Sequence, residues 1–219
     1  MQATGRPPSL KISEIFLSLQ GESSLVGLPT VFVRLAGCPL RCVWCDTAYA
    51  FSGGRTMSLP EILEAVALRE VRRVCVTGGE PLAQPASLPL LRALCDAGHA
   101  VSLETSGAFD IGGVDTRVSR IVDVKAPGSG EVERNRWQNL ALLTRGDELK
   151  FVLKDRADYE WARQLIIDRR LAELCPLLFS PVDGDLAAAT LADWILADRL
   201  PVRFQLQLHK ILWGKERGR

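Results

Sequence analysis

The chain has 219 residues, a length that suits one domain or two small ones, and 47% of them are hydrophobic, enough for a sizeable buried core. Its 27 Lys and Arg residues balance 26 Asp and Glu residues, which gives no broad cationic field for nucleic acid or an anionic membrane. The N-terminal MQATGRPPS lacks the apolar core of a signal peptide, and no apolar run reaches the length of a membrane span. We therefore expect a cytoplasmic protein whose thiols stay reduced.

Apolar runs rich in Val, Ile and Phe alternate along the chain with segments of helical period. A hairpin-like segment at 10–22 comes first. Strands are then predicted at 30–37, 71–79, 99–107, 120–128, 147–154 and 174–182, and a last apolar segment occupies 202–212. Helices are predicted at 58–70, 85–98, 158–175 and 186–200, with Ser58 capping the first and Gly98 closing the second. The alternation predicts parallel strands joined by right-handed crossovers.

About six strand–helix units predict an α/β fold that forms a partial (β/α)6 barrel, since a complete barrel of eight units needs about 250 residues. The connection between the strands at 99–107 and 120–128 contains three glycines and is too short for a full crossover helix. The sequence shows no internal repeat and no low-complexity linker. We therefore expect a single domain over residues 1–219, with residues 1–9 and 214–219 as tails.

Three closely spaced cysteines, Cys38, Cys42 and Cys45, directly follow the strand at 30–37. They fall at the carboxyl end of a parallel strand, where ligands bind in this class of fold. Structural zinc usually has four protein ligands, and the only histidines, His99 and His209, are distant in the sequence. An iron–sulfur cube usually takes four thiolates, so three protein ligands would leave one iron open for chemistry.

The other three cysteines stand alone among apolar residues, and we expect each to be a buried core thiol: Cys75, Cys95 and Cys175. A second motif, VTGGEPLAQ, follows the next predicted barrel strand about 30 residues after the triplet. Its glycines allow close approach of a ligand to the backbone, and Glu80 offers an anion to an ammonium group.

The spacing Cys-x3-Cys-x2-Cys, with Trp44 before the last cysteine, resembles the radical S-adenosylmethionine enzymes. The resemblance implies a barrel of that type with a 4Fe-4S cluster, whose open iron binds the amino and carboxylate groups of S-adenosylmethionine. Reductive cleavage of the sulfonium then releases a 5′-deoxyadenosyl radical, and thiolate clusters reach potentials low enough for this, about −700 mV at the extreme. In this superfamily the GGEP motif contacts the cofactor's amino group.

Further segments in fixed order resemble one family, the 7-carboxy-7-deazaguanine synthases, from about Leu10 to Trp213: LQGES, RLAGC, CDT, ETSG, DVKAPGSGE, LKFVLKD, FSPVDG and LQLHKILW. The resemblance implies ring contraction of 6-carboxy-5,6,7,8-tetrahydropterin to 7-carboxy-7-deazaguanine with loss of ammonia, on the route to queuosine and other 7-deazapurines. It also implies magnesium as a further cofactor, an external electron donor such as a flavodoxin, and a homodimer.

The family's motifs assign site residues to this chain. Those implied to bind substrate are Leu19, Gln20, Gly21, Glu22, Arg34 and Thr77. Those implied to bind S-adenosylmethionine are Trp44, Cys45, Asp46, Gly78, Gly79, Glu80, Thr105, Asp123, Val124, Lys125, Ser180, Pro181, Val182 and Asp183. Cys38, Cys42 and Cys45 would hold the cluster, and Thr47 would contact magnesium.

Several of these residues have an ordinary structural explanation as well. Arg34 is an isolated charge on an apolar strand and needs an anion, which is either the substrate carboxylate or an internal partner. Thr47 could simply cap a loop, and His209 and Lys210 either line the site or are satisfied elsewhere. Residues 214–219 extend past the segment that resembles the family, so the resemblance implies no contact for them.

Two other functions fit part of the pattern. A glycyl-radical activase shares the cysteine triplet and acts on a protein partner, but the LQGES and HKILW segments favour the pterin reaction. A structural module that binds zinc or a cluster would explain the thiols alone. The GGEP loop and the missing fourth ligand argue against it.

Overall fold

The computed structural model describes residues 8–214 and 216–219. Its strands are β1 (Ser9–Leu19), β2 (Pro29–Leu35), β3 (Arg55–Ser58), β4 (Arg73–Gly78), β5 (Ala100–Thr105), β6 (Ser119–Asp123), β7 (Glu148–Leu153), β8 (Leu177–Pro181) and β9 (Arg203–Phe204). Its α-helices are α1 (Leu59–Ala67), α2 (Ser87–Asp96), α3 (Arg156–Asp168), α4 (Ala188–Asp198) and α5 (Leu208–Trp213). No helix in this described part of the chain is long and apolar enough to cross a membrane.

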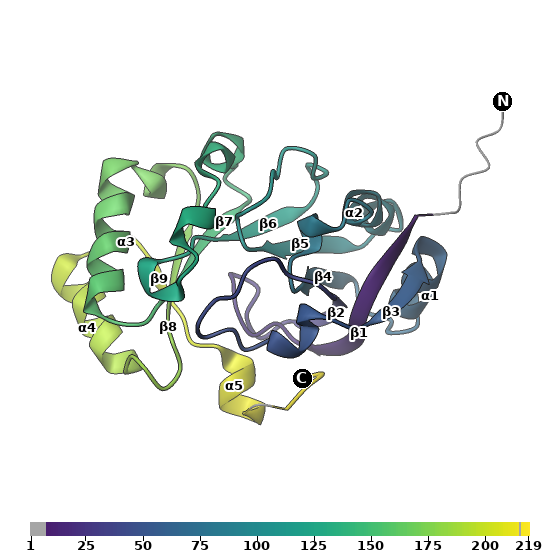
Figure 1. The fold of residues 1–219 in the computed structure, drawn as a ribbon, viewed down its shortest axis with the longest axis horizontal. Coiled ribbons are helices and arrows are strands. Elements are labelled where there is room, and N and C mark those ends of the chain that lie inside the picture. Colours follow the sequence, from purple (N-terminus) through teal and green to yellow (C-terminus); the bar gives the residue numbers. More distant parts are fainter. Residues whose placement is uncertain (1–7, 215) are drawn as a thin grey trace.

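The strands form one sheet in the order β3-β1-β2-β4-β5-β6-β7-β8-β9. All pairs from β2 to β9 are parallel, whereas β1 pairs antiparallel with both β2 and β3. The sheet is curved, and β3 and β9 form its two edges (Figure 1). This arrangement confirms the predicted partial barrel, with the N-terminal hairpin β1–β2 added to it.

The helices lie on the outside of the sheet, with α1 and α2 near its N-terminal strands and α3 and α4 near β7 and β8 (Figure 1). Ser58 caps α1 as predicted, in a capping box in which its hydroxyl accepts from the Glu61 amide and the Glu61 carboxylate accepts from the Ser58 amide. Gly98 follows α2 in a left-handed conformation, as expected for a residue that closes a helix. Buried Val, Ile and Leu side chains from helices and strands form the core between them.

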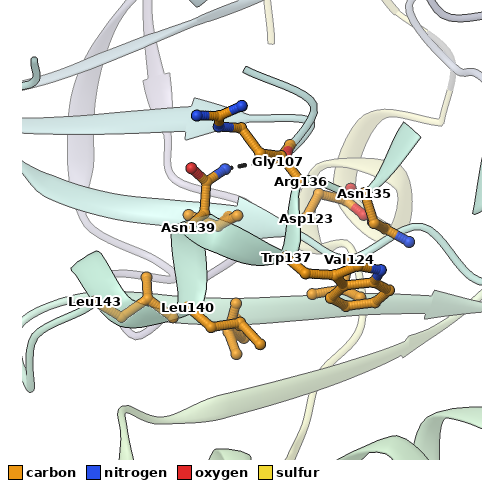
Figure 2. Close-up of a pocket in the computed structure, with 11 residues that line it drawn as sticks. Gly107, Asp123, Val124, Asn135, Arg136, Trp137, Asn139, Leu140 and Leu143 are labelled. Carbon is orange, nitrogen blue, oxygen red and sulfur yellow. Dashed lines mark hydrogen bonds between the residues drawn. The ribbon is translucent and has the colours of Figure 1, made fainter. Parts of the chain in front are cut away.

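The steps from β5 to β6 and from β6 to β7 contain no α-helix; all residues in these connections are described. The first is the short glycine-containing loop that the sequence predicted, and the second holds three 3-10 helices. Trp137, Leu140 and Leu143 from this segment line a small cavity against Val124 (Figure 2). Asn139 ties the two connections together, because its amide donates to the carbonyls of Gly107 and Phe109 at 3.1 and 2.8 Å.

Three expectations were wrong. The segment at 202–212 is divided between the two-residue strand β9 and the helix α5. The predicted helix at 158–175 ends at Asp168, because the chain turns through a left-handed residue at Arg170 before a short 3-10 helix. Cys75 and Cys175 are buried as expected, but Cys95 is only partly buried on α2.

Candidate active site

A cavity of about 750 Å³ lies on the inner side of the sheet and extends to the loops after the parallel strands. Side chains along a strand point alternately to the two faces of the sheet, so every second residue of each strand faces the cavity. These inner residues are Phe32 and Arg34 on β2, Thr77 on β4, Glu104 on β5, Ile121 and Asp123 on β6, and Lys150 and Val152 on β7. Polar and charged groups are thus concentrated inside a sheet whose outer face packs against helices.

The three predicted cluster cysteines all line this cavity from the loop after β2. That loop is fixed to the turn after β6: the Val43 amide donates to the Ser129 carbonyl at 3.1 Å, and the Arg41 amide donates to Glu131 at 2.5 Å. The Arg41 guanidinium also donates to the carbonyl of Cys38 at 2.7 Å. Burial raises the pKa of each free thiol in the triplet, so all three are protonated at neutral pH in the absence of a metal.

The donor set fits a multi-iron cluster better than a single metal ion. Among the described residues, no three Cys, His, Asp or Glu side chains are grouped closely enough to hold one ion. A zinc ion would require all its sulfur ligands about 2.3 Å from one point. Three half-buried thiols that line one cavity, with no fourth Cys or His beside them among the described residues, match a cluster with one open iron.

The GGEP loop is packed against the end of β2. The amides of Gly79 and Glu80 donate to the carbonyls of Leu35 and Gly37 at 3.0 and 2.8 Å, and a Cβ on Gly78 or Gly79 would collide with that backbone. The glycines are therefore required by the approach of two protein segments. They also line the cavity beside the cysteine loop.

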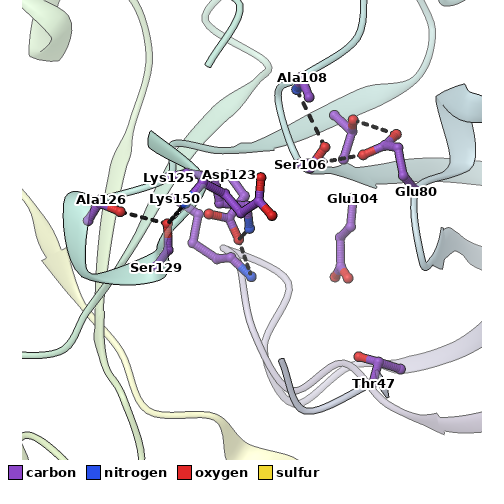
Figure 3. A network of polar contacts seen from close by, with 12 residues as sticks. Thr47, Glu80, Glu104, Ser106, Ala108, Asp123, Lys125, Ala126, Ser129 and Lys150 are labelled. Atoms are coloured by element: carbon purple, nitrogen blue, oxygen red, sulfur yellow. Dashed lines mark hydrogen bonds and ion pairs between the residues drawn. The ribbon is translucent and has the colours of Figure 1, made fainter. Parts of the chain in front are cut away.

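Glu80 is buried beside the cavity and is not among the residues that line it. Its side chain is fully buried and accepts a hydrogen bond from the Leu82 amide at 2.8 Å. It also accepts from the Thr105 hydroxyl at 2.9 Å and from the Ser106 amide at 2.6 Å (Figure 3). These bonds join the GGEP loop to the end of β5. The contact of Glu80 with the cofactor stays a prediction.

Arg34 has both an internal partner and free donors. Its Nε donates to Oε1 of Glu14 on the neighbouring strand at 2.8 Å, and the same oxygen accepts from the Tyr49 hydroxyl at 2.7 Å. The guanidinium also lies over the ring of Phe16. Arg34 lines the cavity, and the hydrogen bonds of the described residues provide no acceptor for its two terminal nitrogens.

A second group of polar side chains in the cavity is centred on Glu104. The Glu104 carboxylate accepts from the Gln20 amide at 3.2 Å and from the Thr77 hydroxyl at 2.9 Å. Figure 3 shows the Glu104 side chain pointing away from Glu80, into the space between Lys150 and Thr47. Carboxylate, amide and hydroxyl groups on one wall suit a heterocycle that carries both donors and acceptors.

Two buried lysines are neutralised by carboxylates. Lys150 forms ion pairs with Glu22 at 2.6 Å and with Asp123 at 3.6 Å, and Lys125 pairs with Asp123 at 3.1 Å. Burial opposes the charged forms, but the partners dominate: the pKa of Glu22 is lowered and that of Lys150 is raised well above its usual value. Both cations therefore stay charged beside the cysteine loop.

The loop 20–22 and the helix α5 close one side of the cavity. The Leu208 amide donates to the Gly21 carbonyl at 2.9 Å, and a Cβ on Gly21 would collide with the ring of His209. Lys210 lies 3.3 Å from Asp46, and although burial opposes it, this ammonium and the Thr47 hydroxyl lower the pKa of Asp46 to about 2. His209 and Lys210, which the sequence left undecided, both line the cavity.

Most of the predicted site residues meet at this cavity. Those that line it are Leu19, Gln20, Gly21, Glu22, Arg34, Thr77, Trp44, Asp46, Gly78, Gly79, Thr105, Asp123, Lys125, Val182, Asp183, Thr47 and the three cysteines. Four do not: Glu80, Val124, Ser180 and Pro181. Val124 points to the outer face and lines the small cavity of Figure 2, and Ser180 and Pro181 are buried within β8.

Sequence reasoning missed several residues that line the site, among them Tyr49, Glu104, Lys150 and Gln207. Lys150 carried the same signal as Arg34, a charge inside an apolar strand, and could have been found by it. Glu104 lies in the ETSG motif and could have been found by its place at the end of a strand. Tyr49 and Gln207 carried no such signal.

Comparisons with known proteins agree with this site. A model of the Radical SAM superfamily matches residues 32–125. The 7-carboxy-7-deazaguanine synthase of Chlorobaculum tepidum is 47% identical, over 94% of this chain and 96% of that protein, and the one of Koribacter versatilis is 45% identical, over 94% and 98%. The crystal structure of QueE from Escherichia coli shares the fold, with a TM-score of 0.73 at 24% identity over 92% of this chain and 95% of that chain. With its cysteine triplet, its GGEP loop and these full-length relatives, the chain belongs to the 7-carboxy-7-deazaguanine synthase family of radical S-adenosylmethionine enzymes.

Proposed function

We propose that the protein converts 6-carboxy-5,6,7,8-tetrahydropterin to 7-carboxy-7-deazaguanine with loss of ammonia. The observation that carries this proposal is that three thiols and the free end of the Arg34 guanidinium line one cavity. The thiols suit a cluster, and the guanidinium suits a carboxylate on the substrate. The volume of about 750 Å³ is within the range of sites that hold small molecules and cofactors.

Cys38, Cys42 and Cys45 would hold the 4Fe-4S cluster, with S-adenosylmethionine beside it along the GGEP loop and the segments after β6 and β8. When bound, these two groups supply one-electron radical chemistry. Lys125 lies among these segments and is kept charged by Asp123. Its ammonium would offset the negative charge of the cluster thiolates and of the cofactor carboxylate. The protein's part is to place the cofactor against the substrate and to exclude water.

Arg34 would bind the substrate carboxylate through its two terminal nitrogens, in the bidentate manner that favours arginine over lysine. Gln20, Thr77 and Glu104 present an amide, a hydroxyl and a carboxylate that match the edge of an aminopyrimidinone. Glu22 is held by Lys150 and by the Gln207 amide at 2.5 Å, which fixes the loop around the ring.

Magnesium at Thr47 is a further part of the proposal. The Thr47 hydroxyl donates to Asp46 at 2.8 Å, its oxygen can still accept or ligate, and Thr47 lines the cavity. Magnesium usually keeps several waters and takes only one or two protein ligands, so a single hydroxyl is sufficient if the substrate supplies oxygens. We also propose a cytoplasmic homodimer reduced by an external donor such as a flavodoxin. Exposed apolar side chains on α5, Ile211 and Leu212, support a contact with a second copy.

The decisive experiment is anaerobic turnover of the reconstituted protein with carboxypterin, S-adenosylmethionine, magnesium and a reductant, followed by mass spectrometry of the products. We expect 5′-deoxyadenosine and 7-carboxy-7-deazaguanine. Cleavage of S-adenosylmethionine without the deazaguanine would favour another radical reaction, such as activation of a protein. Zinc in place of iron, with no cleavage, would favour a structural module.

The Cys42→Ala variant is expected to lose cluster iron and all cofactor cleavage, because Cys42 is one of the three thiols that line the cavity and a cluster needs all three. Cys95→Ala is the matched control, since Cys95 lies on α2 outside the cavity, and its iron content should equal that of the parent. Iron analysis and electron paramagnetic resonance of the reduced proteins measure both. A Cys42→Ala protein that still cleaves S-adenosylmethionine would show the cluster assignment to be wrong.

A further inference from the structure

The C-terminal segment, residues 214 and 216–219, lines the same cavity as the cysteines and Arg34. It follows α5 and brings the chain end beside the 3-10 helix Ala48–Phe51, which carries Tyr49 (Figure 1). The Arg217 guanidinium carbon lies 4.1 Å from the centre of the Tyr49 ring, the distance of a close cation–π contact. Residues expected to form a tail thus contribute to the cavity wall.

Tyr49 connects this contact to Arg34 through one carboxylate oxygen. The Tyr49 hydroxyl donates to Oε1 of Glu14 at 2.7 Å, and Nε of Arg34 donates to the same atom at 2.8 Å. Burial and the Glu14 carboxylate raise the pKa of Tyr49 to about 12, so the phenol keeps its proton and remains a donor at neutral pH. The orientation of Arg34 therefore depends on Glu14, and that of Glu14 on Tyr49.

We propose that Arg217 is a positioning residue that, through Tyr49 and Glu14, holds the Arg34 guanidinium ready for a carboxylate-bearing ligand. The guanidinium of Arg217 lies on the face of the phenol ring, and the ring directs its hydroxyl to Glu14. Glu14 engages only the Nε edge of Arg34, which leaves the terminal nitrogens for the ligand. The C-terminal segment thereby contributes to the selection of anionic ligands. The identity of the ligand used below rests on the proposed function.

The test compares Arg217→Ala, Arg217→Lys and the distant, exposed control Arg145→Ala in the reconstituted holoprotein. Dissociation constants are measured for carboxypterin, for tetrahydropterin without the carboxylate, and for S-adenosylmethionine. Arg217→Ala should weaken carboxypterin binding about two- to fivefold, in line with the strength of an exposed cation–π contact. Binding of the other two ligands should stay unchanged. Arg217→Lys should recover part of the loss, and the control should match the parent.

A double-mutant cycle separates positioning from a general structural role. Tyr49→Phe keeps the ring but removes the hydroxyl that reaches Glu14. In that background Arg217→Ala should have little further effect on carboxypterin binding, because the contact that it supports is already absent. Additive losses, an equal loss for both pterins, or no loss for either would overturn the inference.

Docking of the segment is tested without any ligand by tryptic cleavage after Arg217, followed by mass spectrometry. The parent should be cleaved slowly, and Tyr49→Ala, which removes the ring under Arg217, should be cleaved several times faster. Equal rates would overturn the inference. Failure of the parent to convert carboxypterin would refute the proposed function alone, whereas conversion with unchanged affinity in Arg217→Ala would refute only the role of Arg217.

Discussion

The Arg34 guanidinium binds a protein carboxylate on one edge and leaves its other nitrogens for a ligand. Its Nε donates to Glu14, its side chain lines the cavity, and no described residue accepts from its terminal nitrogens. Arg34→Met should therefore keep the cluster but weaken carboxypterin binding by about 2–5 kcal/mol, the cost of removing one partner of a buried charge pair. Calorimetric titration of the holoprotein measures this loss. The exposed Arg92→Met is the control, and unchanged affinity in Arg34→Met would remove Arg34 from the site.

Thr47 is the proposed magnesium ligand on the cysteine loop. Thr47→Ala should lower the rate of turnover and raise the magnesium concentration needed for half of the maximal rate, because the oxygen ligand is lost. Thr47→Ser keeps the oxygen and should restore most of the activity. Chelation of magnesium should slow the parent without changing the iron–sulfur absorbance. If Thr47→Ala kept the magnesium dependence of the parent, Thr47 would not be a magnesium ligand, and its hydroxyl would serve only to hydrogen-bond Asp46.

The sequence shows which positions of a strand or loop carry a charged side chain, but it does not always show whether that side chain faces the cavity. Arg34 stood out because it interrupts an apolar run, and the structure places it in the cavity. Glu80 was expected there too, yet the amides of Leu82 and Ser106 bind its carboxylate inside the protein. That arrangement depends on the packing of β4 against β5, which no local pattern specifies.

At the scale of elements, the Glu22–Lys150 pair holds the loop after β1 against β7. Removing Lys150 leaves the Glu22 carboxylate buried without its cation, so Lys150→Met should destabilise the apoprotein by about 3–5 kcal/mol at pH 7. Urea unfolding measures this loss. Lys154→Met, one residue after the end of β7 and outside the cavity, is the matched control and should change stability little.

The pH dependence of this loss follows from the sign of the Glu22 shift. Burial would raise the pKa of Glu22, but Lys150 and Gln207 lower it below the usual 4.5, so the unfolded chain binds the proton more tightly. The pair therefore stabilises the parent above about pH 4.5 and loses this effect as the pH falls through the lowered pKa. The difference between parent and Lys150→Met should shrink from pH 7 to pH 4. A constant difference would contradict the role of the pair.

The elements that the sequence predicted well are those with strong periodicity and local end signals, such as α1 with its capping box at Ser58. Those that it missed are short and fixed by distant contacts. The helix α5 has six residues and is held by the Gly21 carbonyl, far away in the chain. The 3-10 segment after β6 is held by Asn139 bonds to a separate loop. Such contacts exist only after the sheet has formed.

At the scale of the whole molecule, the cavity wall is built from residues between Phe16 and Arg219, so a ligand in the cavity can bridge elements from β1 to α5. S-adenosylmethionine at 100 times its dissociation constant should stabilise the cluster-loaded protein by about 2.7 kcal/mol. Anaerobic urea unfolding measures the change. The Cys42→Ala variant should show no such stabilisation. Equal stabilisation of both proteins would mean that the cofactor binds without the cluster.

The meeting of segments far apart in the sequence at one cavity also sets an order of events during synthesis. The cysteine loop is made roughly 160 residues before α5, an interval of roughly 8 to 33 s at 5–20 residues per second. The helix α5 and the described residues after it are made later than every other segment that lines the cavity. The cavity wall therefore stays incomplete throughout that interval, and the thiols are open to iron delivery and to oxidants until α5 docks.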